Sequence, residues 1–362
     1  MNRVAYIYDW FAIRFKYGFH LKNPLYPFRV IKNILRAKRY KYSGANKFVL
    51  RGIDFGVTYL CNFKCDHCYA EKLKDKNRAM MTVEDFRRVC EQAMKLGCLC
   101  FSLQGGEVFL RKEWEDIILA FQPKKNHLLL TTNGSLITDE MVKKLKELGL
   151  DTLYFSVDSG IAEEHDTFRG HKGSYDKIMQ AVESCKKYDV KVVFNTCVTK
   201  ESLYSEGLKK ILDYTHKNRI LVETIFARCL GNFDGQHEVM LNAEDVAYYY
   251  RLRKNYPFVV RDLDNNYGKW GCPAVKEVMY ITAHGDVCPC PYSHISMGNV
   301  LNEPLDVIRD RGLKAKWYDH YHEECLTAMD KDFMKLYYPL VEQKPLITLE
   351  ELQARDREMT ES

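Results

Sequence analysis

The chain has 362 residues, of which 46% are hydrophobic and 28% are charged, and its formal net charge is +5. A chain of this length can bury a large core and predicts one large domain with a smaller partner. The mild positive charge gives no argument for a nucleic-acid partner, and the sequence contains no apolar run of membrane-spanning length.

The cysteine content is high, with 13 cysteines in the chain. An odd count without a secretory signal argues against a disulfide framework. In a reducing compartment, clustered cysteines more often bind metal or carry out redox chemistry. We therefore expect a cytoplasmic protein whose clustered cysteines are functional.

The N-terminal extension, residues 1–46, is basic and rich in aromatic residues. Between positions 28 and 40, apolar residues recur at helical spacing among lysines and arginines: Val30, Ile31, Ile34 and Leu35. A basic amphipathic helix can lie on an anionic membrane surface, which would make the protein membrane-associated, or bind an acidic partner. The alternative is a helix that packs on the core with a charged face in solvent.

From residue 54 onward, strand-like and helical segments alternate. Strands are predicted at 54–59, 99–104, 127–132, 152–157, 191–196 and 220–226. Helices are predicted at 83–95, 114–121, 139–148, 174–188 and 206–217. Six β/α units predict a parallel sheet with helical crossovers, either open and doubly wound or an incomplete barrel. In both folds the chemistry gathers at the C-terminal ends of the strands.

After residue 226 the alternation stops. A helix is predicted at 242–255, followed by a stretch rich in cysteine, glycine and proline. We therefore divide the chain into an extension, a core, a linker helix, a small cysteine-rich domain and a polar tail, at 1–46, 47–235, 236–265, 266–328 and 329–362.

The first predicted strand runs into a loop with three cysteines, Cys61, Cys65 and Cys68. Three thiols within eight residues can converge on one metal centre. Structural zinc usually takes four ligands in close pairs. Three local thiolates instead suit a 4Fe–4S cube that keeps one iron open. A small molecule can chelate that open iron.

The pattern Cys61-x3-Cys65-x2-Cys68 after a first strand resembles the signature of the radical S-adenosylmethionine (SAM) superfamily. The resemblance implies that these cysteines bind a 4Fe–4S cluster whose fourth iron is chelated by SAM. Reductive cleavage of SAM would then give methionine and a 5′-deoxyadenosyl radical that abstracts hydrogen from a substrate. It also implies an α/β fold, a partial (β/α)6 barrel of the TIM type, and a reductant such as flavodoxin or ferredoxin.

Other strand ends resemble secondary motifs of this family. Gly105-Gly106-Glu107 resembles its Gly-Gly-Glu element, in which glycines allow close backbone approach and Glu107 can accept bonds from an ammonium group. An ordinary Gly-Gly turn is the alternative. Asn133 ends the third strand, and in the family this position flanks the SAM site.

The later strands offer further candidates by the same resemblance. Ser156 and Asp158 are expected near the ribose or carboxylate of SAM. Arg169 either joins them or anchors a loop. Cys197 and Cys229, near strand ends expected to face the cavity, are candidate hydrogen donors, because radical epimerases of this superfamily use a thiol in that role. The remaining cysteines are expected to pack in the core.

A second cysteine set consists of Cys272, Cys288, Cys290 and Cys325. The spacing Cys272-x12-Gly285-x4-Cys290 resembles the start of the SPASM or twitch domains of this superfamily, which bind auxiliary clusters. A full SPASM domain continues with four more cysteines, whereas only Cys325 follows here. One auxiliary 4Fe–4S cluster held by all four cysteines is therefore expected, with tetrahedral zinc as the alternative.

Three functions remain open at this stage. The first is a radical SAM enzyme acting on a small molecule, sugar or lipid-linked substrate, favoured because only about fifty residues precede the first strand, fewer than a fused peptide-recognition domain needs. The second is a peptide- or protein-modifying maturase of the SPASM type that uses a separate recognition protein. The third is a non-enzymatic zinc-binding protein.

Overall fold

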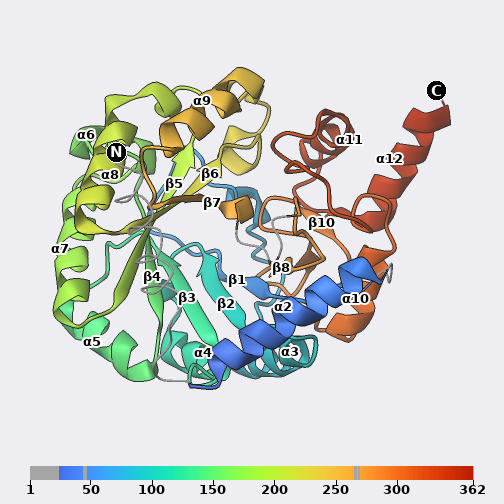
Figure 1. The fold of residues 1–362 in the computed structure, drawn as a ribbon, viewed down its shortest axis with the longest axis horizontal. Coiled ribbons are helices and arrows are strands. Elements are labelled where there is room, and N and C mark those ends of the chain that lie inside the picture. The colour runs from blue at the N-terminus through green and yellow to red at the C-terminus, as the bar shows by residue number, and fades with distance from the viewer. Residues whose placement is uncertain (1–23, 44–46, 265–266, 268–269, 362) are drawn as a thin grey trace.

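A computed structural model describes residues 24–43, 47–264, 267 and 270–361 (Figure 1). The aromatic segment 1–23 and the expected domain boundaries at 46 and 266 lie outside the described residues.

The core is a sheet of nine strands in the order β7-β6-β5-β4-β3-β2-β1-β8-β9. All neighbouring strands are parallel except β8 and β9, which pair antiparallel. The six predicted strands form its centre: β1 Gly52–Thr58, β2 Cys100–Gly105, β3 His127–Thr132, β4 Thr152–Ser156, β5 Lys191–Val198 and β6 Leu221–Phe226. Figure 1 shows the sheet curving as a partial barrel with helices on its outer side. The predicted α/β partial barrel is confirmed.

The outer helices lie close to their predicted positions. They are α3 Val83–Lys95, α4 Trp114–Ala120, α5 Asp139–Leu148, α7 Ser174–Lys187 and α8 Glu206–Asn218. Side-chain caps define several starts, because Thr82, Thr138 and Ser205 each accept a bond from a first-turn N–H. The short helix α6, Ala162–Arg169, was not predicted.

Strand alternation separates the outer core from the barrel interior. Phe55 of β1 and Phe101 of β2 are fully buried and pack against Phe121, with ring centroids 4.8 and 5.3 Å from it. Their neighbours Asp54 and Ser102 point the other way and line an internal cavity. The apolar residues therefore secure the helices, and the alternate positions supply polar groups to the interior.

The sheet continues beyond the six predicted strands. After α9, Ala243–Arg253, strand β7, Val259–Arg261, extends the sheet beside β6. Strand β8, Val278–Ile281, pairs with the opposite edge at β1 and continues into β9, Val287–Cys288. These strands have two to four residues, too few for a periodic pattern to appear in the sequence.

The cysteine-rich region closes with a helical C-terminal part. It contains α10 Leu305–Leu313, α11 Lys331–Val341 and α12 Leu349–Glu361, and a parallel pair of short strands, β10 Ile295–Ser296 and β11 Ile347–Thr348. The polar tail is thus largely helical. Figure 1 shows this part in orange and red at one side of the barrel.

The predicted N-terminal helix is α2, Tyr26–Tyr42. It packs on the protein through buried Asn33 and Ala37, and the Asn33 amide donates to the Gly97 carbonyl over 2.7 Å. The face turned to solvent is apolar at its centre, contrary to the expected charged face. No helix in the described ranges is both long enough and apolar enough to cross a membrane.

Candidate active site

The loop with three cysteines follows β1 at the C-terminal mouth of the barrel. Two neighbouring segments hold its backbone. The N–H of Asp66 donates to the Phe168 carbonyl over 3.0 Å, and the Asn232 amide donates to the Cys65 carbonyl over 2.8 Å. The loop is thereby fixed from α6 on one side and from the segment after β6 on the other.

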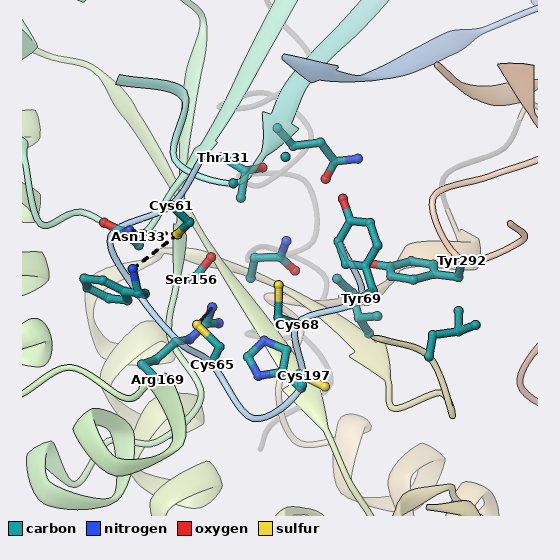
Figure 2. Close-up of a pocket in the computed structure, with 18 of the residues that line it drawn as sticks. Cys61, Cys65, Cys68, Tyr69, Thr131, Asn133, Ser156, Arg169, Cys197 and Tyr292 are labelled. Carbon is teal, nitrogen blue, oxygen red and sulfur yellow. Dashed lines mark hydrogen bonds between the residues drawn. The ribbon is translucent and has the colours of Figure 1, made fainter. Parts of the chain in front are cut away.

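Cys61, Cys65 and Cys68 line one cavity of about 140 Å³ (Figure 2). Predicted site residues from five other strands, helices or loops line the same cavity: Gly105, Gly106, Asn133, Ser156, Arg169 and the candidate hydrogen donor Cys197. The structure thus brings together residues that are up to 136 positions apart in the chain (197 − 61).

Three thiols on one cavity form the donor set that a 4Fe–4S cube with one open iron requires. Within the described ranges, no three His, Cys, Asp or Glu side chains converge closely enough to hold one metal ion. In a cube each thiolate binds a different iron, so the three sulfurs need not meet at one point. Burial raises the pKa of Cys68 to about 11, so metal binding at this thiol must release a proton.

The glycines at the end of β2 are required by close packing. A Cβ on Gly105 would lie 2.3 Å from the Thr58 carbonyl oxygen, and one on Gly106 would lie 2.1 Å from that of Leu60. Gly105 also has a φ of +135°. Any larger residue would push β2 away from the cysteine loop.

Glu107, the candidate acceptor for an ammonium group, is not among the residues that line the cavity. It is fully buried, and its carboxylate accepts bonds from the Thr132 hydroxyl and the Asn133 N–H, each at 2.9 Å. Asn133 in turn donates through its amide to the Asn62 side chain over 2.9 Å. Glu107 therefore braces the end of β3, and Asn133 connects it to the cysteine loop.

Arg169 and Asp158 form a buried ion pair with 2.6 Å between Nε and Oδ2. Asp158 also accepts the Cys197 N–H over 2.9 Å and does not line the cavity. Burial would raise the pKa of Asp158, but the Arg169 guanidinium outweighs it and keeps the pKa below its ordinary value. Arg169 lies 3.9 Å from the Cys65 sulfur, so the pair places a cation beside this thiol.

We expect Asp158→Asn to destabilise the protein by about 3–5 kcal/mol, because it leaves the Arg169 charge buried without its partner. Denaturant unfolding under anaerobic conditions measures this. Asp356→Asn, which removes the partner of the exposed Lys316 ammonium group, should change the unfolding free energy by less than about 1 kcal/mol. Equal effects of both substitutions would contradict the assignment.

The two candidate hydrogen donors lie in different places. Cys197 lines the cavity. Cys229 does not: its sulfur lies 3.3 Å from the Gln236 carbonyl and 3.2 Å from the Met240 sulfur. Cys229 was expected to face the cavity, but it is not among the lining residues, although its neighbours Arg228 and Leu230 are.

The second cysteine set lines an adjoining cavity of about 170 Å³. Cys272, Cys290 and Cys325 all border it. Cys288 does not, since it lies on β9 and packs in a cluster with Tyr59 and Tyr280. The expected set of four ligands is thus reduced to three on this cavity.

The two cavities share six lining residues: Gln104, Thr131, Asn195, Ile225, Arg228 and Tyr292. Arg228 was not predicted as a site residue. Its guanidinium lies 4.0 Å from the Tyr292 ring centre, 3.4 Å from the Cys325 sulfur and 3.0 Å from the Asp262 carboxylate. Arg228 lies two residues after the sixth strand, and this position was the one signal in the sequence that could have marked it as a site residue.

The barrel interior contains charged residues that were not predicted as site residues. Arg51, Asp54 and Glu223 line the second cavity. Burial raises the pKa of Asp54 to about 6. Asp54 and Glu223 alternate with apolar neighbours within their strands, and this alternation could have marked them as inward-facing.

The fold is a partial barrel with two cysteine sets on adjoining cavities. This arrangement defines a class of iron–sulfur protein whose reactions take place at the C-terminal ends of the strands. The family model of the radical SAM superfamily matches residues 56–213, and that of the SPASM iron–sulfur cluster-binding domain matches residues 272–327. The chain belongs to the radical SAM superfamily, whose members are enzymes, and has a SPASM-type C-terminal domain. Its cofactors are SAM with a 4Fe–4S cluster and an auxiliary iron–sulfur cluster.

Three similar proteins show that the relatives of this chain differ in the processes that their names describe. The chain is 30% identical over 166 residues to Fe-coproporphyrin III synthase of Methanosarcina barkeri, covering 46% of this chain but only 41% of that protein. It is 23% identical to the subtilosin biosynthesis protein AlbA of Bacillus subtilis, covering 88% and 72% of the two chains. The crystal structure of Streptococcus suis SuiB bound to its precursor peptide SuiA superposes with a TM-score of 0.63 at 18% identity, covering 78% and 69%.

Proposed function

We propose that this enzyme reductively cleaves SAM at a cluster held by Cys61, Cys65 and Cys68, and that hydrogen is then abstracted from a substrate in the adjoining cavity. The observation that supports the proposal is the shared lining of the two cavities, because a substrate bound there would lie between the two cysteine sets. The auxiliary cluster, held by Cys272, Cys290 and Cys325, would then receive an electron from the substrate.

Several residues of this chain make the first cavity suitable for binding SAM. When bound, the 4Fe–4S cluster and SAM supply a 5′-deoxyadenosyl radical. Asn133 and Ser156 line the cavity with groups that can bond to SAM. The Arg169 cation beside Cys65 stabilises the thiolate that a metal requires. Phe63 and Phe233 also line the cavity and help to exclude water.

The substrate class that the cavity favours is a small polar molecule or a small polar group. The second cavity is about 170 Å³ and carries both charge signs, from Arg51, Asp54 and Glu223. Such a lining can bind hydroxyl, amino and carboxylate groups together, as a sugar or amino-acid derivative would need. A peptide whose single side chain enters the cavity is the second candidate, favoured by the resemblance to AlbA and SuiB.

Anaerobic purification and a cleavage assay test the proposal. We expect a brown protein with about eight irons per chain, which forms 5′-deoxyadenosine from SAM with dithionite or a reduced flavodoxin as the electron donor. A colourless protein that contains zinc, or a brown one that leaves SAM intact, would contradict it.

The substrate class needs a separate experiment. Extract from the source cells is fractionated by size, and each fraction is tested for stimulation of 5′-deoxyadenosine formation. Stimulation by the fraction of small molecules supports the first candidate. Stimulation confined to a protease-sensitive fraction supports the peptide.

A further inference from the structure

The outward face of α2 is an apolar stripe. Its members are Phe28, Ile31, Leu35 and Tyr42, with exposed fractions of 69%, 52%, 62% and 81%. Their spacing of three, four and seven residues places them on one side of the helix, opposite buried Asn33 and Ala37. A soluble helix normally has the reverse arrangement, with its apolar side on the core.

Positive charge surrounds this stripe. The sequence of α2 contains no acidic residue, and its basic residues are Arg29, Lys32, Arg36, Lys38, Arg39 and Lys41. On a helical projection Lys32 and Arg39 lie on one side of the stripe and Lys38 on the other. The outward side of α2 therefore combines exposed apolar groups with cations and has no counter-charge within the helix.

The helix lies at the end of the barrel away from the cysteines. Asn33 bonds to Gly97, just before β2, and the Arg29 guanidinium donates to the Lys125 carbonyl, just before β3. Both contacts are at the N-terminal ends of parallel strands. The cysteine loop follows the C-terminal end of β1, so contact through α2 leaves the mouth of the first cavity accessible.

We propose that the outward face of α2 binds an anionic lipid surface. The stripe would enter the boundary between headgroups and acyl chains, and the flanking lysines and arginines would contact lipid phosphates. A second copy of this chain is the less favourable partner, because two α2 helices facing each other would bring like charges together. Neutral protein surfaces would leave the cations without complementary charge.

Vesicle sedimentation of the anaerobic full-length protein tests this. Vesicles of phosphatidylcholine alone are compared with vesicles that also contain phosphatidylglycerol. We expect binding to the anionic vesicles, weakened by added salt. The double variant Phe28→Ser/Leu35→Ser should lower the partition coefficient by about tenfold or more, and Lys32→Glu/Arg39→Glu should remove the preference for anionic lipid.

Leu119→Ser is the matched control, because Leu119 on α4 is 50% exposed outside the stripe; it should bind vesicles like the wild type. The α2 variants should retain helical circular dichroism and 5′-deoxyadenosine formation, which separates this proposal from the proposed catalytic function. The proposal is overturned if the wild type does not sediment with anionic vesicles, or if Phe28→Ser/Leu35→Ser sediments as well as the wild type. It is also overturned if the stripe variants convert a dimer to a monomer without changing lipid binding.

Discussion

Cys65→Ala is expected to lower 5′-deoxyadenosine formation from SAM by at least about 1,000-fold. Cys65 is the middle member of the three thiols on the first cavity, and the carbonyl of the same residue is held by Asn232. Removing one of three thiolates leaves a second iron without a protein ligand, so the cube cannot be retained with a single open iron. Product analysis after anaerobic reconstitution, with dithionite as reductant, measures the loss.

Cys185→Ala is the matched control for this experiment. Cys185 is as deeply buried as Cys65 but lies on α7 and lines neither cavity. It should cleave SAM at nearly the wild-type rate, with only a modest loss of stability from the small void. Retained cleavage by Cys65→Ala would show that the cluster is held elsewhere.

The parts of the site that could be predicted from sequence are those whose residues lie close together in the chain. Three cysteines within eight residues fix their own proximity, and a Gly-Gly pair at a strand end indicates close backbone approach. The contact of Gly106 with Leu60 shows why that pair is needed. The central strands were predictable because short segments rich in apolar and β-branched residues alternate regularly with helical patterns.

The parts that could not be predicted depend on side-chain direction. Glu107 follows Gly106 directly, yet its carboxylate turns to Thr132 and Asn133 and leaves the cavity. Cys229 follows Arg228, and only Arg228 lines the cavities. In a loop after a strand, tertiary contacts decide the direction of each side chain. A loop has no regular residue periodicity, so the sequence alone does not show these directions.

The Asp158 and Arg169 pair shows what the sequence predicts and what only the structure adds. Sequence placed both residues near the SAM site, and the structure places only Arg169 on the cavity. Asp158 acts on the cavity indirectly, because it orients the Arg169 guanidinium and the backbone of Cys197. A positioning residue of this kind differs from a ligand in its effect, because its loss weakens the folded state as well as the site.

The auxiliary cysteines allow a sharper comparison, between Cys290 and Cys288. They are two positions apart in the chain, but only Cys290 lines the second cavity with Cys272 and Cys325. Cys288 lies on β9 opposite Tyr280 and packs with Tyr59, whereas Cys290 follows the end of β9, so the two side chains have different surroundings. We expect Cys290→Ala to lower the iron content from about eight to about four per chain, and Cys288→Ala to leave it unchanged.

The same two variants separate the roles of the clusters. Cys290→Ala should still form 5′-deoxyadenosine from SAM, since the first cavity keeps its three thiols, but it should make no net product once the substrate is known. Iron analysis and EPR of the reduced proteins measure the first difference, and product analysis the second. Loss of four irons in Cys288→Ala would restore it as a fourth ligand and require β9 to rearrange when the cluster binds. Normal product from Cys290→Ala would mean that the electron leaves the substrate by another route, because a cavity with only two thiols could not hold the auxiliary cluster in place.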